Sequence, residues 1–303
     1  MFGSGCALVP RRRTFLWRLV TAAVFLVVAR ATWAQAIGVD APYVPTPWSV
    51  VDAMLQLAKV GSRDFVIDLG SGDGRIVITA AKRYGARGFG ADIDGALVAV
   101  AQEEARRQGV AGRVEFHEQN LHLTDISRAT VLTLYLSQRM LIELRPRLFA
   151  ELRPGTRVVS HDFDMEKWQP DAHVTVPVPD KPYGSPRSEV YLWEMPANAA
   201  GAWRWRSTVA GSAVDYELEL RQTFQMLQGR ALVGGKAGRL EAGRMRGDEI
   251  RFMLTAEVNG RPVRHELTGR VSGDAVAGKV KLASGETLDW SATRIRRGKI
   301  EER

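Results

Sequence analysis

Val66-Ile67-Asp68-Leu69-Gly70-Ser71-Gly72-Asp73-Gly74-Arg75 is the stretch that decides the fold of this 303-residue chain. The apolar run over residues 65–67 predicts a buried strand, the alternating glycines predict a turn, and residues 76–84 predict a helix. Such a strand–loop–helix unit is typical of the nucleotide-binding corner of a doubly wound α/β sheet. The glycines permit positive φ angles in the turn and leave bare backbone against which a ligand can lie.

The loop departs from the two common phosphate-binding patterns. Arg75 stands where the dinucleotide-binding pattern G-x-G-x-x-G has its third glycine, and the Gly-Lys-Ser/Thr of a P-loop is absent. Asp68 and Asp73 would repel a pyrophosphate, but they suit a ligand that carries a positive centre and an ammonium group. A second strand over residues 88–92 ends in Asp92, whose carboxylate can accept both hydroxyl groups of a ribose.

This arrangement resembles the class I S-adenosylmethionine-dependent methyltransferases, whose first motif is acid-x-Gly-x-Gly-x-Gly, followed by an acid that ends the second strand. The resemblance implies S-adenosylmethionine as the cofactor and a cofactor site of ten residues. These are Asp68, Gly70, Ser71, Gly72, Asp73, Gly74, Asp92, Ile93, Asn120 and Leu121. Related enzymes often carry an aspartate at the adenine amino group where this chain has Asn120, and an amide can also hydrogen-bond a base edge.

Strands and helices alternate through residues 37–196 in the order of a methyltransferase domain. Helices are expected at 49–57, 95–108 and 140–152, strands at 113–118, 130–136 and 157–164, and a closing strand pair at 173–178 and 189–193. The predicted fold class is therefore α/β, with a Rossmann-like, seven-stranded methyltransferase sheet.

Residues 197–303 predict a separate β-rich accessory domain. Short alternating strands are separated by turn signals such as Asn259-Gly260, at spacings typical of a β-meander. About eight strands in a hundred residues indicate a small all-β barrel or sandwich, in which the aromatic residues are expected to form the core.

Residues 1–36 are expected to be a signal peptide of the twin-arginine type or, as an alternative, a membrane anchor. Arginines 11–13 precede an apolar run at 19–29, and small residues suited to cleavage follow. The leader predicts a periplasmic or membrane-anchored protein, with a cytoplasmic location as the alternative. Since S-adenosylmethionine is made in the cytosol, export of a folded, cofactor-loaded protein would reconcile the leader with the cofactor.

Three segments sharpen the resemblance. Tyr43-Val44-Pro45-Thr46, the glycine loop, and Val158-Val159-Ser160 with Trp168 are similar to the protein-lysine methyltransferases related to the enzyme that modifies the ATP synthase c-subunit. The similarity covers residues 41–170. It implies methyl transfer to a protein lysine, whose ammonium, with a reference pKa of about 10.4, must first lose a proton.

The expected catalytic residues are Tyr43, Tyr135 and Asp162, and His161 and Asp164 are also candidates to line the acceptor pocket. On a strand over 157–164, Asp162 and Asp164 would point to one face and His161 to the other. The histidines outside this run show no metal-ligand spacing, so no metal site is predicted.

Two alternatives share the predicted fold: a methyltransferase that acts on a small molecule, and an exported binding protein that has lost its activity. The net charge is +8 and unevenly spread, and the +6 over residues 201–303 is weak evidence for an acidic partner, so nucleic-acid binding is not predicted. The single cysteine, Cys6, precedes the leader arginines, so disulfides and cysteine nucleophiles are excluded from the rest of the chain.

Overall fold

The computed structural model describes residues 1, 43–181, 184–209, 212–258, 260–283 and 285–302. The chain divides into two units, Met1–Tyr43 and Val44–Arg303, and the fold described below is that of the second. Apart from Met1, the predicted leader at 1–36 lies outside the described residues. No helix within the described ranges is both long enough and apolar enough to span a bilayer.

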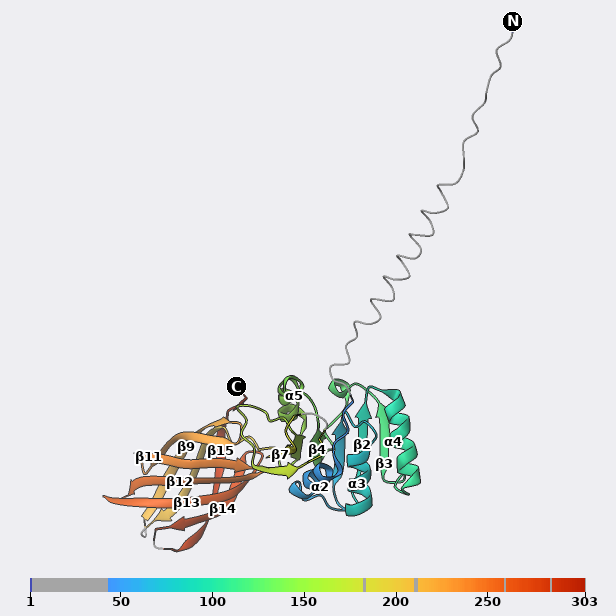
Figure 1. Ribbon diagram of the computed structural model, residues 1–303. Coiled ribbons are helices and arrows are strands. Elements are labelled where there is room, and N and C mark those ends of the chain that lie inside the picture. The colour runs from blue at the N-terminus through green and yellow to red at the C-terminus, as the bar shows by residue number, and fades with distance from the viewer. Residues whose placement is uncertain (2–42, 182–183, 210–211, 259, 284, 303) are drawn as a thin grey trace. The chain divides into compact units, whose positions relative to one another are not determined.

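A seven-stranded sheet forms the first part of the second unit, with the strand order β3-β2-β1-β4-β5-β7-β6 (Figure 1). Neighbouring strands are parallel except that β7 runs antiparallel to both β5 and β6. The strands are β1 (Phe65–Leu69), β2 (Arg87–Asp92), β3 (Val114–Glu118), β4 (Val131–Leu134), β5 (Arg157–His161), β6 (Ala172–Pro177) and β7 (Arg187–Glu194). This order, with the terminal antiparallel hairpin, confirms the predicted Rossmann-like methyltransferase sheet.

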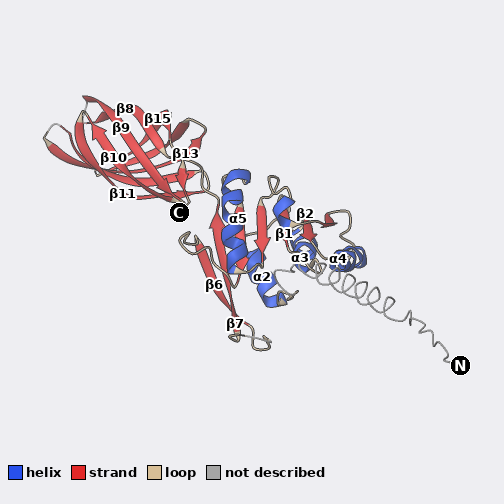
Figure 2. Cartoon of the chain, turned by 90° about the horizontal axis from the view of Figure 1, so that it is seen from above, coloured by secondary structure: helices blue, strands red, loops and turns tan. Residues whose placement is uncertain are grey.

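Helices cover both faces of this sheet because its central strands are apolar on both sides (Figure 2). On one face Val66, Val131 and Val159 pack with α2 (Trp48–Leu57) and α3 (Arg75–Tyr84). On the other, Ile67 and Leu132 pack with α5 (Gln138–Glu151). Helix α4 (Gly95–Arg107) packs on α3 and β3.

Two helix starts differ from the sequence prediction. Helix α2 begins at Trp48, after Pro47, whose carbonyl accepts hydrogen bonds from Val50 N and Val51 N. Ser49, the residue at which this helix was predicted to begin, lies inside it. Helix α5 begins two residues earlier than predicted, because the Ser137 hydroxyl serves as its cap.

Strand β5 is shorter than predicted. It ends at His161, and Asp162 follows with a left-handed φ of 62°. The expectation that Asp162 and Asp164 lie on this strand is therefore wrong. The local cause is that Asp162 N–H donates to Glu189 O and its Oδ1 accepts from Glu189 N, so the backbone turns against β7.

The described residues of 201–302 form the second sheet, and eight of its strands close into an antiparallel barrel. The sheet runs in chain order from β8 to β15, and β15 pairs with β8 to complete the circuit. The strands are β8 (Gly201–Val209), β9 (Ser212–Thr223), β10 (Met226–Val233), β11 (Lys236–Arg246), β12 (Glu249–Val258), β13 (Arg261–Ser272), β14 (Ala275–Leu282) and β15 (Thr287–Arg297). A two-residue strand, β16 (Ile300–Glu301), adds parallel to β9. The sequence predicted a barrel or a sandwich, and the structure is a barrel.

The turn between β9 and β10 joins the barrel to the seven-stranded sheet. Phe224 at this turn is 3% exposed and stacks on Trp168, with ring centroids 5.8 Å apart and an interplanar angle of 9°. Beside it, Gln225 Nε2 donates to Gln169 O at 2.7 Å, and Arg244 pairs with Asp171 at 2.6 Å. The two sheets therefore share part of one apolar core.

Candidate active site

The glycine loop is fastened to the end of β2 by backbone hydrogen bonds. Gly70 N and Ser71 N both donate to Ala91 O, at 2.8 and 3.1 Å, and Gly72 N donates to Asp92 Oδ2 at 2.7 Å. Gly70, Gly72 and Gly74 all have positive φ angles, of 77°, 53° and 78°. The alternate glycines are thus required by the path of the backbone, as the sequence predicted.

Asp92 occupies the bend between the loop and helix α4. Besides Gly72 N, its carboxylate accepts a hydrogen bond from Asp94 N at 3.0 Å, and Asp92 O accepts one from Gln119 N. These bonds fix the carboxylate while each oxygen keeps a further lone pair for a hydroxyl group. Ile93, the next residue, is 60% exposed and offers apolar surface beside the carboxylate.

Asp68 is the buried acid of the site. It is 3% exposed, and its Oδ1 accepts a hydrogen bond from Thr133 Oγ1 at 2.7 Å. Burial raises the pKa of Asp68 to about 7, with smaller contributions from the negative charges of Asp92 and Asp73, and the Thr133 hydrogen bond opposes this rise. Asp68 is therefore an acid that a nearby positive charge could convert to the carboxylate.

Asp73 has a partner within the chain, which the sequence prediction did not foresee. Arg75 Nη2 donates to Asp73 Oδ2 at 2.6 Å, and Arg75 Nε donates to Oδ1 at 2.9 Å. The same guanidinium donates to Thr46 O at 2.7 Å and lies 4.9 Å from the ring centroid of Trp48. The charge of Asp73 is thus neutralised locally, and the predicted role of Asp73 at the cofactor stays a prediction.

The remaining predicted cofactor residues lie around the same edge of the sheet. The Ser71 side chain is buried against Gly90 of β2, so its hydroxyl points into the protein. Asn120 Oδ1 accepts a hydrogen bond from His122 N at 2.8 Å and begins the short helix η1 (Leu121–Leu123). Leu121 packs against the core beneath α5.

Tyr135 and His161 meet at the carboxyl ends of β4 and β5. Their ring centroids are 3.9 Å apart, with an interplanar angle of 32°. His161 is fully buried, with Nδ1 3.3 Å from Thr46 Oγ1 and Nε2 2.9 Å from Ser188 Oγ. Burial lowers the pKa of His161 to about 4, since the charged imidazolium would be desolvated. His161 is therefore neutral at physiological pH.

Asp162 is held by a lysine that sequence reasoning did not single out. Lys181 Nζ donates to Asp162 Oδ2 at 2.6 Å and to Arg187 O at 3.0 Å, and the Lys181 side chain is only 8% exposed. Asp162 Oδ2 also lies 3.4 Å from His161 Nε2. The structure thus places an ammonium group beside the aromatic pair of Tyr135 and His161.

The two other pocket candidates are Asp164 and Tyr43. Asp164 accepts hydrogen bonds from Gln138 Nε2 at 3.1 Å and Glu166 N at 2.9 Å, so it organises the loop after β5. Tyr43 is the last residue of the N-terminal unit and is 47% exposed. The catalytic role expected of Tyr43 stays a prediction.

Comparison with known proteins identifies the family. The profile of the ANTKMT methyltransferase domain matches residues 68–172. A protein-lysine N-methyltransferase of Saccharolobus islandicus is 45% identical over 136 residues, which cover 45% of this chain and 84% of that protein. The chain belongs to this family of class I S-adenosylmethionine-dependent methyltransferases. Its cofactor is S-adenosylmethionine.

A mouse relative of this methyltransferase matches over a smaller share of its own length. The adenine nucleotide translocase lysine N-methyltransferase of Mus musculus is 37% identical over 134 residues, which cover 44% of this chain and 58% of the mouse protein. Among solved structures, an RNA methyltransferase from Salinibacter ruber in complex with S-adenosyl-L-homocysteine is 52% identical. It covers 50% of this chain and 93% of that chain, with a TM-score of 0.45.

The described residues of this methyltransferase fit its cofactor. The buried acid Asp68 and the fixed carboxylate of Asp92 suit the positive charge and the hydroxyl groups of S-adenosylmethionine. The glycine loop leaves backbone bare at the same edge, and Ile93 provides exposed apolar surface for a base. Asp68 and Asp92 would hold the cofactor, which supplies an activated methyl group on its sulfonium.

Sequence reasoning missed two residues of this methyltransferase that join separate parts of the site. Thr46 was noted only within the Tyr-Val-Pro-Thr segment, yet it connects the Arg75–Asp73 pair to His161. Lys181 lies in a loop rich in proline and glycine, where no local pattern marks a lysine that reaches back to Asp162. The spacing between these partners, 115 residues for Thr46 and His161, explains why no motif could reveal them.

Proposed function

We propose that this protein transfers the methyl group of S-adenosylmethionine to lysine side chains of a protein substrate. The observation that carries the proposal is the 45% identity to an archaeal protein-lysine N-methyltransferase over the glycine-loop domain, of which 84% is covered. The relatives do not favour the two alternatives, a small-molecule methyltransferase and an inactive binding protein.

The acceptor side of the site supports a lysine substrate on chemical grounds. The carboxylate of Asp162 together with the carbonyl of Arg187 already accommodates one lysine ammonium, that of Lys181, at low exposure. Tyr135 and the neutral His161 form an uncharged aromatic wall next to it. Such a wall admits the apolar stem of a lysine and does not repel its positive charge.

The chain's contribution to the reaction is orientation and control of charge. Methyl transfer is an in-line displacement, which is accelerated when donor and acceptor are held in near-attack geometry. Desolvation beside the Tyr135–His161 wall lowers the pKa of an incoming lysine, because the ammonium form loses its hydration. Both nitrogens of His161 are engaged by Thr46 and Ser188, so His161 shapes the wall and is not the base that removes the proton.

A labelling experiment tests the proposed acceptor. The full-length protein would be incubated with tritium-labelled S-adenosylmethionine and a lysate of its own source cells, and each sample would be divided for protease or ribonuclease treatment. We expect label that protease releases, ribonuclease leaves and amino-acid analysis assigns to methyl-lysine. Gly72→Arg, which fills the loop above Asp92, should abolish the label.

The other outcomes separate the competing functions. Label that ribonuclease releases, or label confined to small molecules, would refute the proposed acceptor while leaving the enzyme a methyltransferase. Saturable binding of S-adenosylmethionine by calorimetry, without label in any fraction, would instead support the non-catalytic binding protein.

We further propose a periplasmic or membrane-anchored location, and its support is the basic and apolar pattern of residues 11–36 alone. Fractionation of the source cells, with immunodetection against residues 197–303, tests this location. A protein found wholly in the cytosol would overturn the proposed export and leave the enzymatic proposal intact.

A further inference from the structure

Thr46 makes one contact toward the glycine loop and another toward the Tyr135–His161 wall. The residue is 4% exposed. Its carbonyl oxygen accepts a hydrogen bond from Arg75 Nη1 at 2.7 Å, and its Oγ1 lies 3.3 Å from His161 Nδ1. A single buried residue therefore touches both the chain that would hold the cofactor and the wall proposed for the acceptor lysine.

The backbone at Thr46 is held in place from two sides. Thr46 stands between Pro45 and Pro47, and proline fixes its own φ angle and confines the residue before it to extended conformations. The carbonyl of Pro47 accepts the first hydrogen bonds of helix α2. On the other side, Arg75 is itself fixed by its paired hydrogen bonds to Asp73. The hydroxyl group of Thr46 consequently projects from a rigid point.

The surroundings of His161 determine which ring nitrogen carries the proton. Nε2 lies 2.9 Å from Ser188 Oγ and 3.4 Å from Asp162 Oδ2. A carboxylate can only accept hydrogen bonds, and its negative charge attracts a proton on the nearer nitrogen. A proton on Nε2 leaves Nδ1 of the neutral ring as an acceptor. The Thr46 hydroxyl is then the donor to Nδ1.

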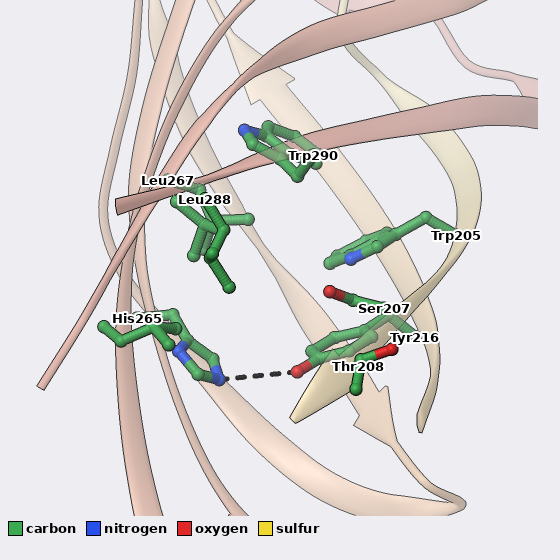
Figure 3. A pocket seen from close by; sticks show the side chains of 10 residues that line it. Trp205, Ser207, Thr208, Tyr216, His265, Leu267, Leu288 and Trp290 are labelled. Atoms are coloured by element: carbon green, nitrogen blue, oxygen red, sulfur yellow. Dashed lines mark hydrogen bonds between the residues drawn. The ribbon is translucent and has the colours of Figure 1, made fainter. Parts of the chain in front are cut away.

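The other buried histidine of the described residues lacks such a pair of contacts. His265 lies in the barrel and is 4% exposed, and its Nε2 is 3.4 Å from the Tyr216 hydroxyl, the contact dashed in Figure 3. Its Nδ1 has no hydrogen-bond partner in the described part of the chain. Burial of a histidine therefore does not by itself secure both ring nitrogens in this protein, whereas His161 has a partner at each of them.

We propose that Thr46 is a positioning residue for methyl transfer. Its hydroxyl donates to Nδ1 and holds His161 as the Nε2–H tautomer against Tyr135, and the bond from Arg75 keeps this wall in register with the glycine loop. Donor and acceptor react fastest when both are held in near-attack geometry, so the relative position of loop and wall affects the rate. The inference rests on the proposed function, which assigns the wall to the acceptor lysine.

Nitrogen-15 NMR of the histidine-labelled, full-length protein tests the assigned hydrogen bond, and His161→Gln identifies the His161 signals. We expect one tautomer of His161 in the parent, with the proton on Nε2. Thr46→Val keeps the shape of threonine and removes its hydroxyl, so the Nδ1 signal should shift to that of an acceptor without a donor. The signals of His265, in the barrel, should stay where they are in the parent.

The rate of methyl transfer tests the positioning role. At saturating S-adenosylmethionine, Thr46→Val should label lysate protein about tenfold more slowly, the effect of one hydrogen bond of about 1.4 kcal/mol. Its dissociation constant for S-adenosylmethionine should equal that of the parent, because the carbonyl that Arg75 contacts remains. Thr46→Ser restores the hydroxyl and should recover most of the lost rate.

Thr156→Val is the matched control. Thr156 is also 4% exposed, its Oγ1 donates to Ala129 O at 3.0 Å, and it precedes β5 at the end opposite His161. Loss of this buried hydrogen bond should lower the melting temperature, as in Thr46→Val. It should change neither the rate of transfer nor the His161 signals.

Four outcomes would overturn the inference while leaving the protein a methyltransferase. They are a proton on Nδ1 in the parent, an unchanged rate in Thr46→Val, an equal loss of rate in Thr156→Val, and a loss of S-adenosylmethionine affinity in Thr46→Val as large as its loss of rate. A parent that methylates nothing in any fraction would instead refute the proposed function, and the positioning role would fall with it.

Discussion

The carboxylate of Asp92 holds two parts of the cofactor site in place, the glycine loop and the start of α4. It accepts Gly72 N at 2.7 Å and Asp94 N at 3.0 Å. Asp92→Asn has the same shape, but its amide nitrogen must face one of these donors, and the negative charge is lost. We expect S-adenosylmethionine to bind about tenfold more weakly, a cost of about 1.4 kcal/mol, as measured by titration calorimetry.

Asp94→Asn is the matched control for this prediction. It removes the same charge two residues away, and asparagine caps a helix as well as aspartate does, so the hydrogen bonds from Ala96 N and Leu97 N can persist. Its affinity for the cofactor should equal that of the parent. Equal losses in the two variants would mean that general charge, and not the position of Asp92, governs binding.

The raised pKa of Asp68 predicts that the free energy of unfolding depends on pH. Its pKa is about 7 in the folded protein and 3.8 as the reference for the unfolded chain. Between these values the native state binds more protons than the unfolded state, so the Asp68 contribution to the free energy of unfolding falls as pH rises from about 4 to about 7. Above pH 7 the destabilisation is complete.

Asp68→Asn tests this sign, because a neutral amide can still accept the Thr133 hydrogen bond. In urea unfolding without cofactor, the variant should gain stability relative to the parent progressively from pH 4 to pH 7 and keep that gain at pH 8. A difference between variant and parent that does not change with pH would show that Asp68 titrates at its ordinary value.

At the scale of the loop and helix, we predict that Gly74 does not tolerate a side chain. Its φ is 78°, and a Cβ at this position would lie 2.6 Å from Phe116 Cζ and 2.9 Å from Ala101 Cβ. Gly109, after α4, has a similar φ of 71° but open space around it. Gly109→Ala should therefore cost only the left-handed backbone strain, about 1–2 kcal/mol, and Gly74→Ala should cost about 1–3 kcal/mol more.

Urea unfolding of both variants measures this difference, and cofactor affinity adds a second readout. Gly74→Ala must displace the loop or helix α4, so it should also weaken S-adenosylmethionine binding, whereas Gly109→Ala should not. Equal stability losses in the two variants would show that Phe116 and Ala101 give way without cost.

The elements that the sequence predicted correctly are those whose structure is determined by residues close together in the chain. The glycine loop follows from its own residues, and α4, predicted over 95–108, is observed over Gly95–Arg107. The end of β5 could not be predicted in this way. There, Asp162 turns away because of bonds to Glu189 and Lys181, which lie in another strand and another loop.

At the scale of the whole molecule, the alternation of apolar and polar residues predicted the strands of the accessory domain. It did not predict whether these strands form a closed barrel or a sandwich. Period-two burial from Trp203 to Ala292 is the same in a barrel and a sandwich, because both have one inward face. The pairing of β15 with β8 distinguishes them, and it joins residues about 90 positions apart. Similarly, nothing local marked Phe224 as part of the core beneath α5.

Phe224 therefore tests whether the two sheets unfold as one. Its ring packs on Trp168 and Phe149, at centroid distances of 5.8 and 6.0 Å, and Arg145 lies over it. Truncating a buried phenylalanine costs about 3–5 kcal/mol, and here the loss falls on the junction between the sheets. We expect one calorimetric endotherm for the parent, shifted as a whole by S-adenosylmethionine, and two endotherms for Phe224→Ala, of which only one responds to the cofactor.

Met226→Ala is the control, because Met226 follows the same turn and is 48% exposed. It should retain the single endotherm. A single, cofactor-sensitive endotherm in Phe224→Ala would mean that the polar contacts around the turn, such as Arg244–Asp171 and Gln225 with Gln169, suffice to couple the sheets. Two endotherms in the parent would mean that the barrel folds independently, and the shared core would then position the accessory domain without stabilising it.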